Sequence, residues 1–243
     1  MGLTQTHLLI LLQEARRRPL QGSILTLGIQ EVTMSFDTLS TLARQHDFPL
    51  VDVYPLELSS NSNHALQGYL SHLSFFKLLG FQEEKTVDAS PYEGCDLVHD
   101  LNVRPLPDAY RNAFDAVVDA GTMEHVFNIP NVFSNIFDAL KIGGRIIHTL
   151  PTSNFVDHGF YSFSPTLFSD FYRANQFEIN RLEVMLYTED PRDPVFFHPY
   201  RPGSFQTYSA GQLGRGLCGT VCIATKTAKS TCNQTPQQHY YTG

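Results

Sequence analysis

The sequence contains no tryptophan, only four cysteines, and few charged side chains, which make up 17% of its 243 residues. No CxxC pair is present, so neither a zinc site nor a disulfide framework is expected; the scattered cysteines are Cys95, Cys218, Cys222 and Cys232. This cysteine usage favours a reducing, cytoplasmic compartment. A hydrophobic fraction of 42% with so little charge excludes intrinsic disorder for most of the chain.

Basic residues are scarce as well. The 17 Lys and Arg are outnumbered by 24 Asp and Glu, a net charge of −7, which argues against nucleic-acid binding because such binding needs clustered positive charge. Long apolar runs are also missing. The run Leu8–Leu12 is too short to span a bilayer, and Arg16–Arg18 follow it, the reverse of the charge order in a secretory signal. We therefore expect no stable membrane insertion and a small-molecule partner, and leave the oligomeric state open.

What the chain does contain is an alternation of short apolar runs with stretches of helical periodicity. Strands are predicted at Ser23–Gly28, Thr86–Asp88, Asp96–His99, Phe114–Asp119, Arg145–Leu150, Ile179–Tyr187 and Thr220–Lys226. Helices are predicted at residues 4–18, 36–46, 66–79, 130–140 and 165–174, the third ended by Gly80, the fourth by Gly143–Gly144 and the fifth opened by Ser164-Pro165. The pattern predicts an α/β fold with a Rossmann-like, mostly parallel sheet, helices on both faces and an antiparallel hairpin at one edge.

Domain boundaries follow from the same pattern. Residues 1–228 are expected to form a single domain with an insertion at about 34–75, followed by a flexible tail at 229–243. Inside the insertion we predict a strand at Phe48–Tyr54 and a loop at Ser59–Asn63. The aromatic-rich loop from Asp190 to Tyr208 is expected to cover a sheet edge, with the lining of an acceptor pocket as the alternative.

Acidic side chains follow three of the predicted strands. Open parallel sheets bind ligands beyond the carboxyl ends of their strands, and Asp88, Asp100 and Asp119 lie at such ends. Ribose hydroxyls or an adenine amino group are suitable partners for these carboxylates. Each acid alone is equally well explained as a cap of the next helix or turn. The three together predict a nucleotide-like ligand.

Three longer segments resemble a known family. Val87–Asn102 reads VDASPYEGCDLVHDLN, Asp115–Asn128 reads DAVVDAGTMEHVFN, and Leu140–Pro151 reads LKIGGRIIHTLP. Together they resemble class I S-adenosylmethionine-dependent methyltransferases, and more narrowly the bacterial methyltransferase-like proteins that carry a GT-x-EHVFN segment and a later HGFY-x-FSP segment. Those two segments are here Gly121–Asn128 and His158–Pro165, and the resemblance covers roughly residues 23–190.

The resemblance implies S-adenosylmethionine as the cofactor and assigns roles to the strand ends. Asp88 would accept hydrogen bonds from both ribose hydroxyls, with Asp52 as a competing candidate. Asp100 would face the adenine amino group, and Asp119 would belong to the segment under the methionine end. The full set of implied cofactor contacts is Gly28, Gln30, Asp88, Ala89, Asp100, Leu101, Asn102, Asp119 and Gly121.

The same resemblance places the substrate beside the later segments. Glu124 and His125 would begin the following helix near the acceptor, and His158 is a candidate general base because its usual pKa is close to neutral. His125 and Tyr161 are the other catalytic candidates. The alternative for His158 and Tyr161 is a purely structural role, in a helix-entry loop packed by aromatic side chains.

The turn after the first strand departs from the family pattern. Most members have a glycine-rich turn resembling E/D-x-G-x-G-x-G, whereas Leu27-Gly28-Ile29-Gln30-Glu31 retains a single glycine. The main hypothesis is a methyltransferase acting on a small-molecule acceptor. A methyltransferase-like binding or regulatory protein without turnover is the alternative that this turn favours, and a nicotinamide oxidoreductase is a distant third.

Overall fold

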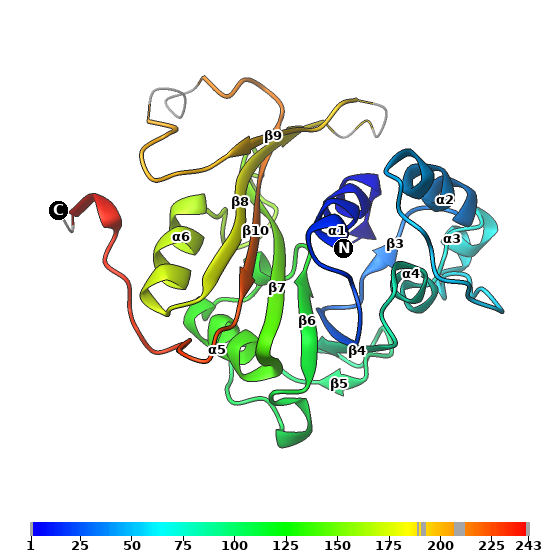
Figure 1. The fold of residues 1–243 in the computed structure, drawn as a ribbon, viewed down its shortest axis with the longest axis horizontal. Coiled ribbons are helices and arrows are strands. Elements are labelled where there is room, and N and C mark those ends of the chain that lie inside the picture. Colours follow the sequence, from blue (N-terminus) through cyan, green and yellow to red (C-terminus); the bar gives the residue numbers. More distant parts are fainter. Residues whose placement is uncertain (1, 189, 191–192, 207–211, 242–243) are drawn as a thin grey trace. The chain divides into compact units, whose positions relative to one another are not determined.

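The computed structural model describes residues 2–188, 190, 193–206 and 212–241. The chain is organised in two compact units, residues 1–98 and 99–243. Each unit combines strands and helices (Figure 1).

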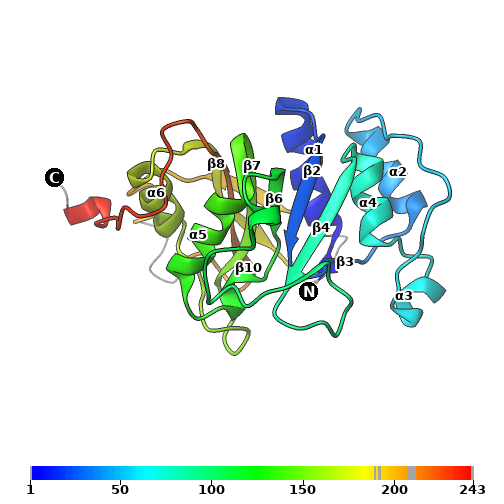
Figure 2. The same cartoon turned by 90° about the horizontal axis from the view of Figure 1, so that it is seen from below.

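The first unit contains a parallel sheet. Its strands are β2 (Ser23–Leu27), β4 (Glu83–Asp88) and β5 (Leu97–Val98), in the order β5-β4-β2. Figure 2 shows β2 and β4 side by side. A second, two-stranded parallel sheet pairs β1 (Gly2–Leu3) with β3 (Glu31–Val32). Four of the five residues of β2 are buried, so the apolar run that predicted this strand lies in the core.

Four helices belong to this unit: α1 (Gln5–Arg17), α2 (Phe36–Gln45), α3 (Ser62–Leu66) and α4 (His72–Leu79). Serine side chains start α2 and α4, since Ser35 accepts a hydrogen bond from the Thr38 N–H and Ser71 accepts one from the Ser74 N–H. Gly80 ends α4 with a φ of 115°, as predicted, and a Cβ there would clash with the Leu20 carbonyl.

The region of the expected insertion differs from the prediction in three places. The helix expected from Leu66 begins only at His72, because Tyr69 and Leu70 are extended and form isolated bridges with Ser35 and Leu58. The expected loop at residues 59–63 already contains the start of α3. No strand forms at residues 48–54, which lie in an irregular segment.

A histidine–carboxylate pair links α4 to β4. Nδ1 of His72 lies 2.8 Å from Oε1 of the buried Glu84. Burial acts to lower the pKa of His72, but the hydrogen bond to Glu84 and its negative charge outweigh it and raise that pKa above 6.5. Burial also raises the pKa of Glu84. A histidine whose folded pKa is raised stabilises the fold below its unfolded pKa, and this contribution is lost as the pH rises through the folded value.

We therefore expect His72→Gln to destabilise the protein in a pH-dependent way. At about pH 6 the substitution removes the charged partner of a buried carboxylate and should lower the free energy of unfolding by about 1–3 kcal/mol. At a pH well above the raised pKa of His72 the loss should be smaller, because the wild-type histidine is then neutral. Urea unfolding of both proteins at the two pH values measures the difference. Equal losses at both would contradict this account of the pair.

The second unit is built on a mixed sheet. Its strands are β6 (Phe114–Asp119), β7 (Leu140–Ser153), β8 (Glu178–Tyr187), β9 (Phe196–Pro199) and β10 (Leu217–Thr225), in the order β6-β7-β10-β8-β9. β6 and β7 are parallel, whereas β10 is antiparallel to both β7 and β8. The predicted antiparallel pairing of the two late strands is confirmed. β9, within the expected loop, adds a further antiparallel edge strand.

Two helices cover one face of this sheet. α5 (Ile129–Ala139) packs against β6 and β7, and α6 (Pro165–Ala174) packs against β8 and β10 (Figure 1). Phe133 of α5 stacks on Phe171 of α6 with ring centroids 3.9 Å apart, so the helices lie side by side. Ser164 accepts a hydrogen bond from the Thr166 N–H, as expected of the serine before Pro165.

One further expectation is corrected here. Gly143–Gly144 do not break α5, which ends at Ala139; they lie inside β7, at a register irregularity opposite β6. A Cβ at Gly144 would lie 2.9 Å from the carbonyl oxygens of Lys141 and Phe114, so close backbone contact requires glycine there. The expected tail makes specific contacts: Gln234 N–H donates to Asn175, and His239 N–H donates to Asp170.

The remaining described elements are short 3-10 turns: η1 (Asp108–Tyr110), η2 (Met123–His125) and η3 (His239–Tyr241). The expected α/β class is confirmed, with parallel strands in both units and an antiparallel edge in the second. Among the described residues, no helix is long and apolar enough to cross a bilayer.

Candidate functional site

Hydrogen bonds connect three buried side chains at the end of β6. Asp119 and His148 are both 0% exposed, with Oδ2 of the aspartate 2.8 Å from Nδ1 of the histidine. Nε2 of His148 lies 2.7 Å from the Tyr172 hydroxyl, whose pKa burial raises well above 10. The other aspartate oxygen accepts hydrogen bonds from the N–H groups of Thr122 and Met123. Both Asp119 oxygens are therefore engaged in hydrogen bonds inside the protein.

The turn that follows carries a carboxylate without hydrogen bonds. Glu124 is 0% exposed, and neither of its side-chain oxygens has a hydrogen-bond partner among the described residues. Burial, reinforced by the negative charge of Asp119, raises the pKa of Glu124 to about 8. The sequence predicts Glu124 at the start of the following helix. In the structure it lies in the short turn η2, because α5 begins only at Ile129.

A second segment, residues 158–161, docks onto this turn. The Phe160 N–H donates to the Glu124 carbonyl at 2.9 Å, and the Tyr161 hydroxyl donates to the Phe127 carbonyl at 2.9 Å. Gly159 faces Glu124 so closely that a Cβ would lie 2.9 Å from the Glu124 carbonyl oxygen. The two segments that carry the family resemblance, 121–128 and 158–165, are thus packed together beyond the ends of the parallel strands β6 and β7.

Two imidazoles flank the buried carboxylate. Nε2 of His158 lies 3.6 Å from Oε1 of Glu124, and Nε2 of His125 lies 4.0 Å from the same oxygen. Their side chains are 38% and 44% exposed, so the cluster faces solvent on the histidine side. Burial, together with the charge of His158, lowers the pKa of His125. The structure brings the predicted catalytic residues His125 and His158 together, and holds Tyr161 beside them through its bond to Phe127.

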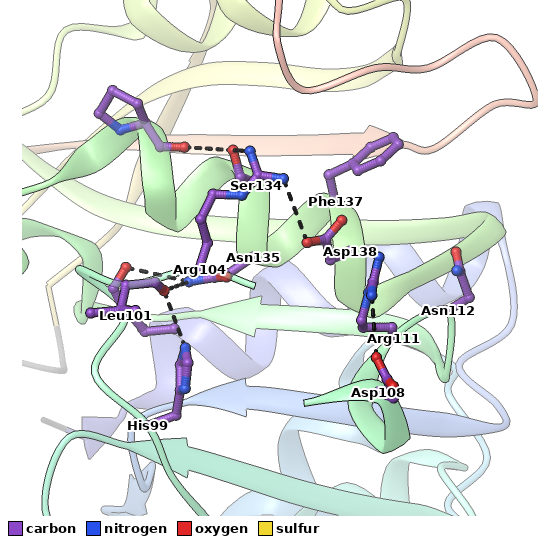
Figure 3. Close-up of polar contacts among 12 residues, drawn as sticks. His99, Leu101, Arg104, Asp108, Arg111, Asn112, Ser134, Asn135, Phe137 and Asp138 are labelled. Carbon is purple, nitrogen blue, oxygen red and sulfur yellow. Dashed lines mark hydrogen bonds and ion pairs between the residues drawn. The ribbon is translucent and has the colours of Figure 1, made fainter. Parts of the chain in front are cut away.

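The loop containing the predicted adenine contacts is fastened to α5 (Figure 3). The side-chain amide of buried Asn135 donates to the Leu101 and Val103 carbonyls, at 3.3 and 2.9 Å. Arg104 donates to the Ser134 hydroxyl at 3.1 Å and lies 3.8 Å from an Asp138 oxygen. Side chains of α5 therefore hold this part of the loop in place. The sequence did not indicate these residues, Ser134, Asn135 and Asp138, as part of the site.

Within that loop, Asp100 and Asn102 form a local turn. Oδ1 of Asp100 accepts hydrogen bonds from the backbone and side-chain N–H groups of Asn102, both at 2.8 Å. These bonds hold the pKa of Asp100 below its usual value. Asn102 in turn accepts from the Asn128 N–H at 2.8 Å, while its carbonyl accepts from the Asn131 amide. Asp100 is exposed and Leu101 is buried.

In the first unit, a backbone hydrogen bond joins the turn after β2 to the end of β4. Gly28 has a φ of 71°, and its N–H donates to the Val87 carbonyl at 2.7 Å. Asp88 is the last residue of β4 and is half-buried, followed by exposed Ala89. Its Oδ1 accepts from the Ser90 N–H at 2.9 Å. Asp52 lies in an irregular segment rather than at a strand end.

Gln30, another predicted cofactor contact, is turned into the protein. It is 1% exposed, and its side-chain amide donates to the Leu27 carbonyl at 2.7 Å. Its oxygen has no hydrogen-bond partner among the described residues.

A cavity of about 350 Å³ lies in the second unit. Tyr200 lines it, and its hydroxyl is 2.7 Å from the Thr166 hydroxyl. Ser162 and Ser164, from the segment that begins at His158, line it as well. The preceding residues 196–199 form β9 and cover the sheet edge, as expected for the loop 190–208. Residues 191–192, 207 and 208 of that loop lie outside the described residues.

Sequence reasoning missed the close fit of Gly159, the anchoring by Asn135 and the partner of Asp119. Gly159 lies in the segment 158–165, which the sequence had already indicated. The sequence could not show that Gly159 contacts Glu124 in the folded protein. For Asn135, the available signal was a polar residue on the buried face of a predicted helix.

No protein-family model and no curated protein matches the chain. Among solved structures, YcgJ from Bacillus subtilis is 12% identical over 92% of this chain and 99% of that one, with a TM-score of 0.48. The N-methyltransferase NodS from Bradyrhizobium japonicum is 10% identical over 92% and 96%, with a TM-score of 0.46. An S-adenosylmethionine-dependent methyltransferase from Thermotoga maritima, a possible histamine N-methyltransferase, is 13% identical over 90% and 89%, with a TM-score of 0.41. These values describe a similarity in chain path and assign neither an activity nor a substrate to this chain.

Proposed function

We propose that this chain is an S-adenosylmethionine-dependent methyltransferase that acts on a small-molecule acceptor. The observation that carries the proposal is the docking of segments 121–128 and 158–165 beyond the ends of β6 and β7. Strand ends of this kind are where open α/β sheets bind their ligands. The cavity of about 350 Å³ lined by Ser162 and Ser164 is of the size that small molecules occupy.

Groups at the other strand ends support this choice of cofactor. Asp88 has one carboxylate oxygen, Oδ2, without a partner among the described residues, which suits a ribose hydroxyl donor. Gly28 has the left-handed backbone that its place in the tight turn after β2 requires. Asp100 is exposed and can accept from an adenine amino group, and the backbone at Gly121 remains for the methionine end. When bound, S-adenosylmethionine supplies an already activated methyl group.

The chain's own residues then have to orient the acceptor and take up its proton. His125 is suited to accept a proton because its lowered pKa keeps the imidazole neutral at pH 7. His158 is held next to it, with ring centroids 5.3 Å apart, and both rings are accessible from solvent. For an acceptor with an O–H or N–H group, one of these imidazole nitrogens would take up the proton that the acceptor loses.

Calorimetric titration with S-adenosylmethionine and S-adenosylhomocysteine tests cofactor use. Saturable binding is expected, and Asp88→Ala should weaken it at least about tenfold, because the loss of hydrogen bonds from two hydroxyls to a carboxylate exceeds 1.4 kcal/mol. Asp52→Ala is the matched control and should bind like the wild type. Absence of binding heat in the folded wild type, or loss of binding in Asp52→Ala alone, would contradict the assignment.

A binding or regulatory protein without turnover is the second candidate. The single-glycine turn and the inward-facing Gln30 side chain favour it, since fewer groups there reach outward to a ligand. Single-turnover assays with labelled cofactor separate the two. A methyltransferase should label an acceptor from a mixed panel of amines and hydroxy compounds, and His158→Ala should slow the labelling without changing cofactor affinity.

A further inference from the structure

The strongest unexplained feature of the second unit is the side chain of Glu124. Its carboxyl group is fully buried, yet both oxygens lack hydrogen-bond partners among the described residues. A buried polar group without a partner costs about 1–3 kcal/mol or more, and such groups in native proteins commonly have a bound water or ion as their partner. Oε1 of Glu124 faces His125 and His158, so a ligand bound by all three side chains would supply the missing partner of the carboxylate.

The three side chains already have a suitable geometry for a metal ion. One ligand atom from each of Glu124, His125 and His158 lies within 4.8 Å of the others. The imidazole nitrogens are 4.0 and 3.6 Å from the same glutamate oxygen, Oε1. Donor atoms bound to one tetrahedral zinc ion at about 2.0–2.1 Å lie about 3.3 Å apart, so modest inward shifts of exposed rings complete the arrangement.

The donor set selects the kind of ion. Two imidazoles with one carboxylate are typical of zinc and of other first-row divalent metals, whereas calcium and magnesium prefer oxygen ligands alone. We propose that Glu124, His125 and His158 form a binding site for one divalent transition-metal ion of the zinc class. The exposed side of both imidazoles leaves at least one coordination position for water or for a substrate atom.

The surrounding backbone holds the ligands in place before any metal binds. The carbonyl of Glu124 accepts from the Phe160 and Tyr161 N–H groups, at 2.9 and 3.3 Å, which fixes the segment carrying His158. Gly159 permits this approach because it has no Cβ. His125 is fixed through its own N–H, which donates to the Thr122 carbonyl at 3.0 Å. A preorganised set of ligands is what distinguishes a metal site from a chance cluster.

The proposed metal site does not depend on cofactor binding, although an ion held by Nε2 of His125 and of His158 would prevent those nitrogens from acting as the general base. It requires neither S-adenosylmethionine nor an acceptor, and a protein without turnover would bind the ion equally well. It also differs from the expectation drawn from the cysteines, because its ligands are a glutamate and two histidines from segments far apart in the sequence. Metal titration of the isolated protein therefore tests it separately from cofactor binding.

The test is to strip the 243-residue chain with EDTA and titrate it with zinc chloride against a chromophoric chelator near neutral pH. The wild type should bind one zinc ion per chain. Glu124→Gln and His158→Gln should each weaken zinc binding at least about 100-fold, since each removes a direct ligand. The matched control is His198→Gln, which removes an exposed histidine from β9 and should leave the affinity unchanged.

Cobalt(II) substitution supplies a second readout. The wild type should give the visible absorption of a cobalt ion with nitrogen and oxygen ligands, and His125→Gln, which changes an exposed side chain, should lose it while circular dichroism shows a folded protein. Failure of the wild type to bind zinc, equal binding by all variants, which would mark an adventitious ion only, or a thiolate charge-transfer band would each overturn the proposal.

Discussion

Asp119→Ala should lower the free energy of unfolding by about 3–5 kcal/mol, because it leaves several buried hydrogen-bonding groups without their partner. The substitution leaves His148, which is fully buried, without its carboxylate partner at 2.8 Å. It also removes the acceptor for the Thr122 and Met123 N–H groups, at 3.1 and 3.2 Å. For a chain of this size the melting temperature should fall by roughly 10 °C.

Asp115→Ala is the control for this prediction. Asp115 lies on the same strand, β6, but its ion pair with Lys141 is partly exposed, and such pairs contribute about 1 kcal/mol or less. Urea unfolding monitored by circular dichroism compares the two variants. A loss in Asp119→Ala no greater than that in Asp115→Ala would show that the chain from Asp119 through His148 to Tyr172 does not hold the end of β6.

Gly159→Val should separate the two docked segments. Its Cβ would lie 2.9 Å from the Glu124 carbonyl oxygen, closer than Cβ atoms approach other atoms, and 3.1 Å from Cγ of the same residue. Residues 158–161 must then move away, breaking the hydrogen bond from the Phe160 N–H and withdrawing His158 from Glu124. We expect zinc affinity to fall at least about 100-fold, and stability to fall by about 1–3 kcal/mol from overpacking.

Gly203→Val offers a matched change outside this contact. A Cβ at Gly203 meets no atom within 4 Å, and the only expected cost is the strain of a φ of 83°, about 1–3 kcal/mol. The two variants should therefore lose similar stability but differ in zinc affinity. If Gly159→Val binds zinc as tightly as Gly203→Val, the docking of residues 158–161 does not position His158.

Much of the fold is encoded in local patterns. The strand Phe114–Asp119 was predicted with its observed bounds, because a short apolar run ends there in a polar residue. The start of α6 follows from Ser164 and Pro165, which respectively cap the helix and set its first turn. Asp88 is the last residue of β4, as predicted for the strand Thr86–Asp88, although β4 begins earlier, at Glu83.

Other features depend on contacts between distant segments and could not be predicted in this way. The extended conformation at Tyr69 and Leu70 is imposed by bridges to Ser35 and Leu58, against the helical periodicity of their own segment. β9 forms because β8 offers an edge for pairing. The burial of Asp119 becomes understandable once His148 is seen beside it, on the β7 segment that lies alongside β6.

The same limit applies to the candidate site. The sequence identified His125 and His158 as candidates, and placed Glu124 near the substrate. It could not show that the backbone of Glu124 binds residues 160 and 161, because that contact joins segments beyond two different strands. The carboxylate's lack of hydrogen-bond partners is likewise a property of the packed protein, visible only once the neighbours of Glu124 are known.

Hydrogen–deuterium exchange with and without S-adenosylhomocysteine tests most directly whether the strand ends bind the cofactor. If the cofactor binds there, exchange should slow in peptides covering residues 86–90, 99–103 and 119–123, with little change at 196–206 in the aromatic-rich loop. Unchanged exchange throughout at saturating ligand, or protection confined to that loop, would contradict it.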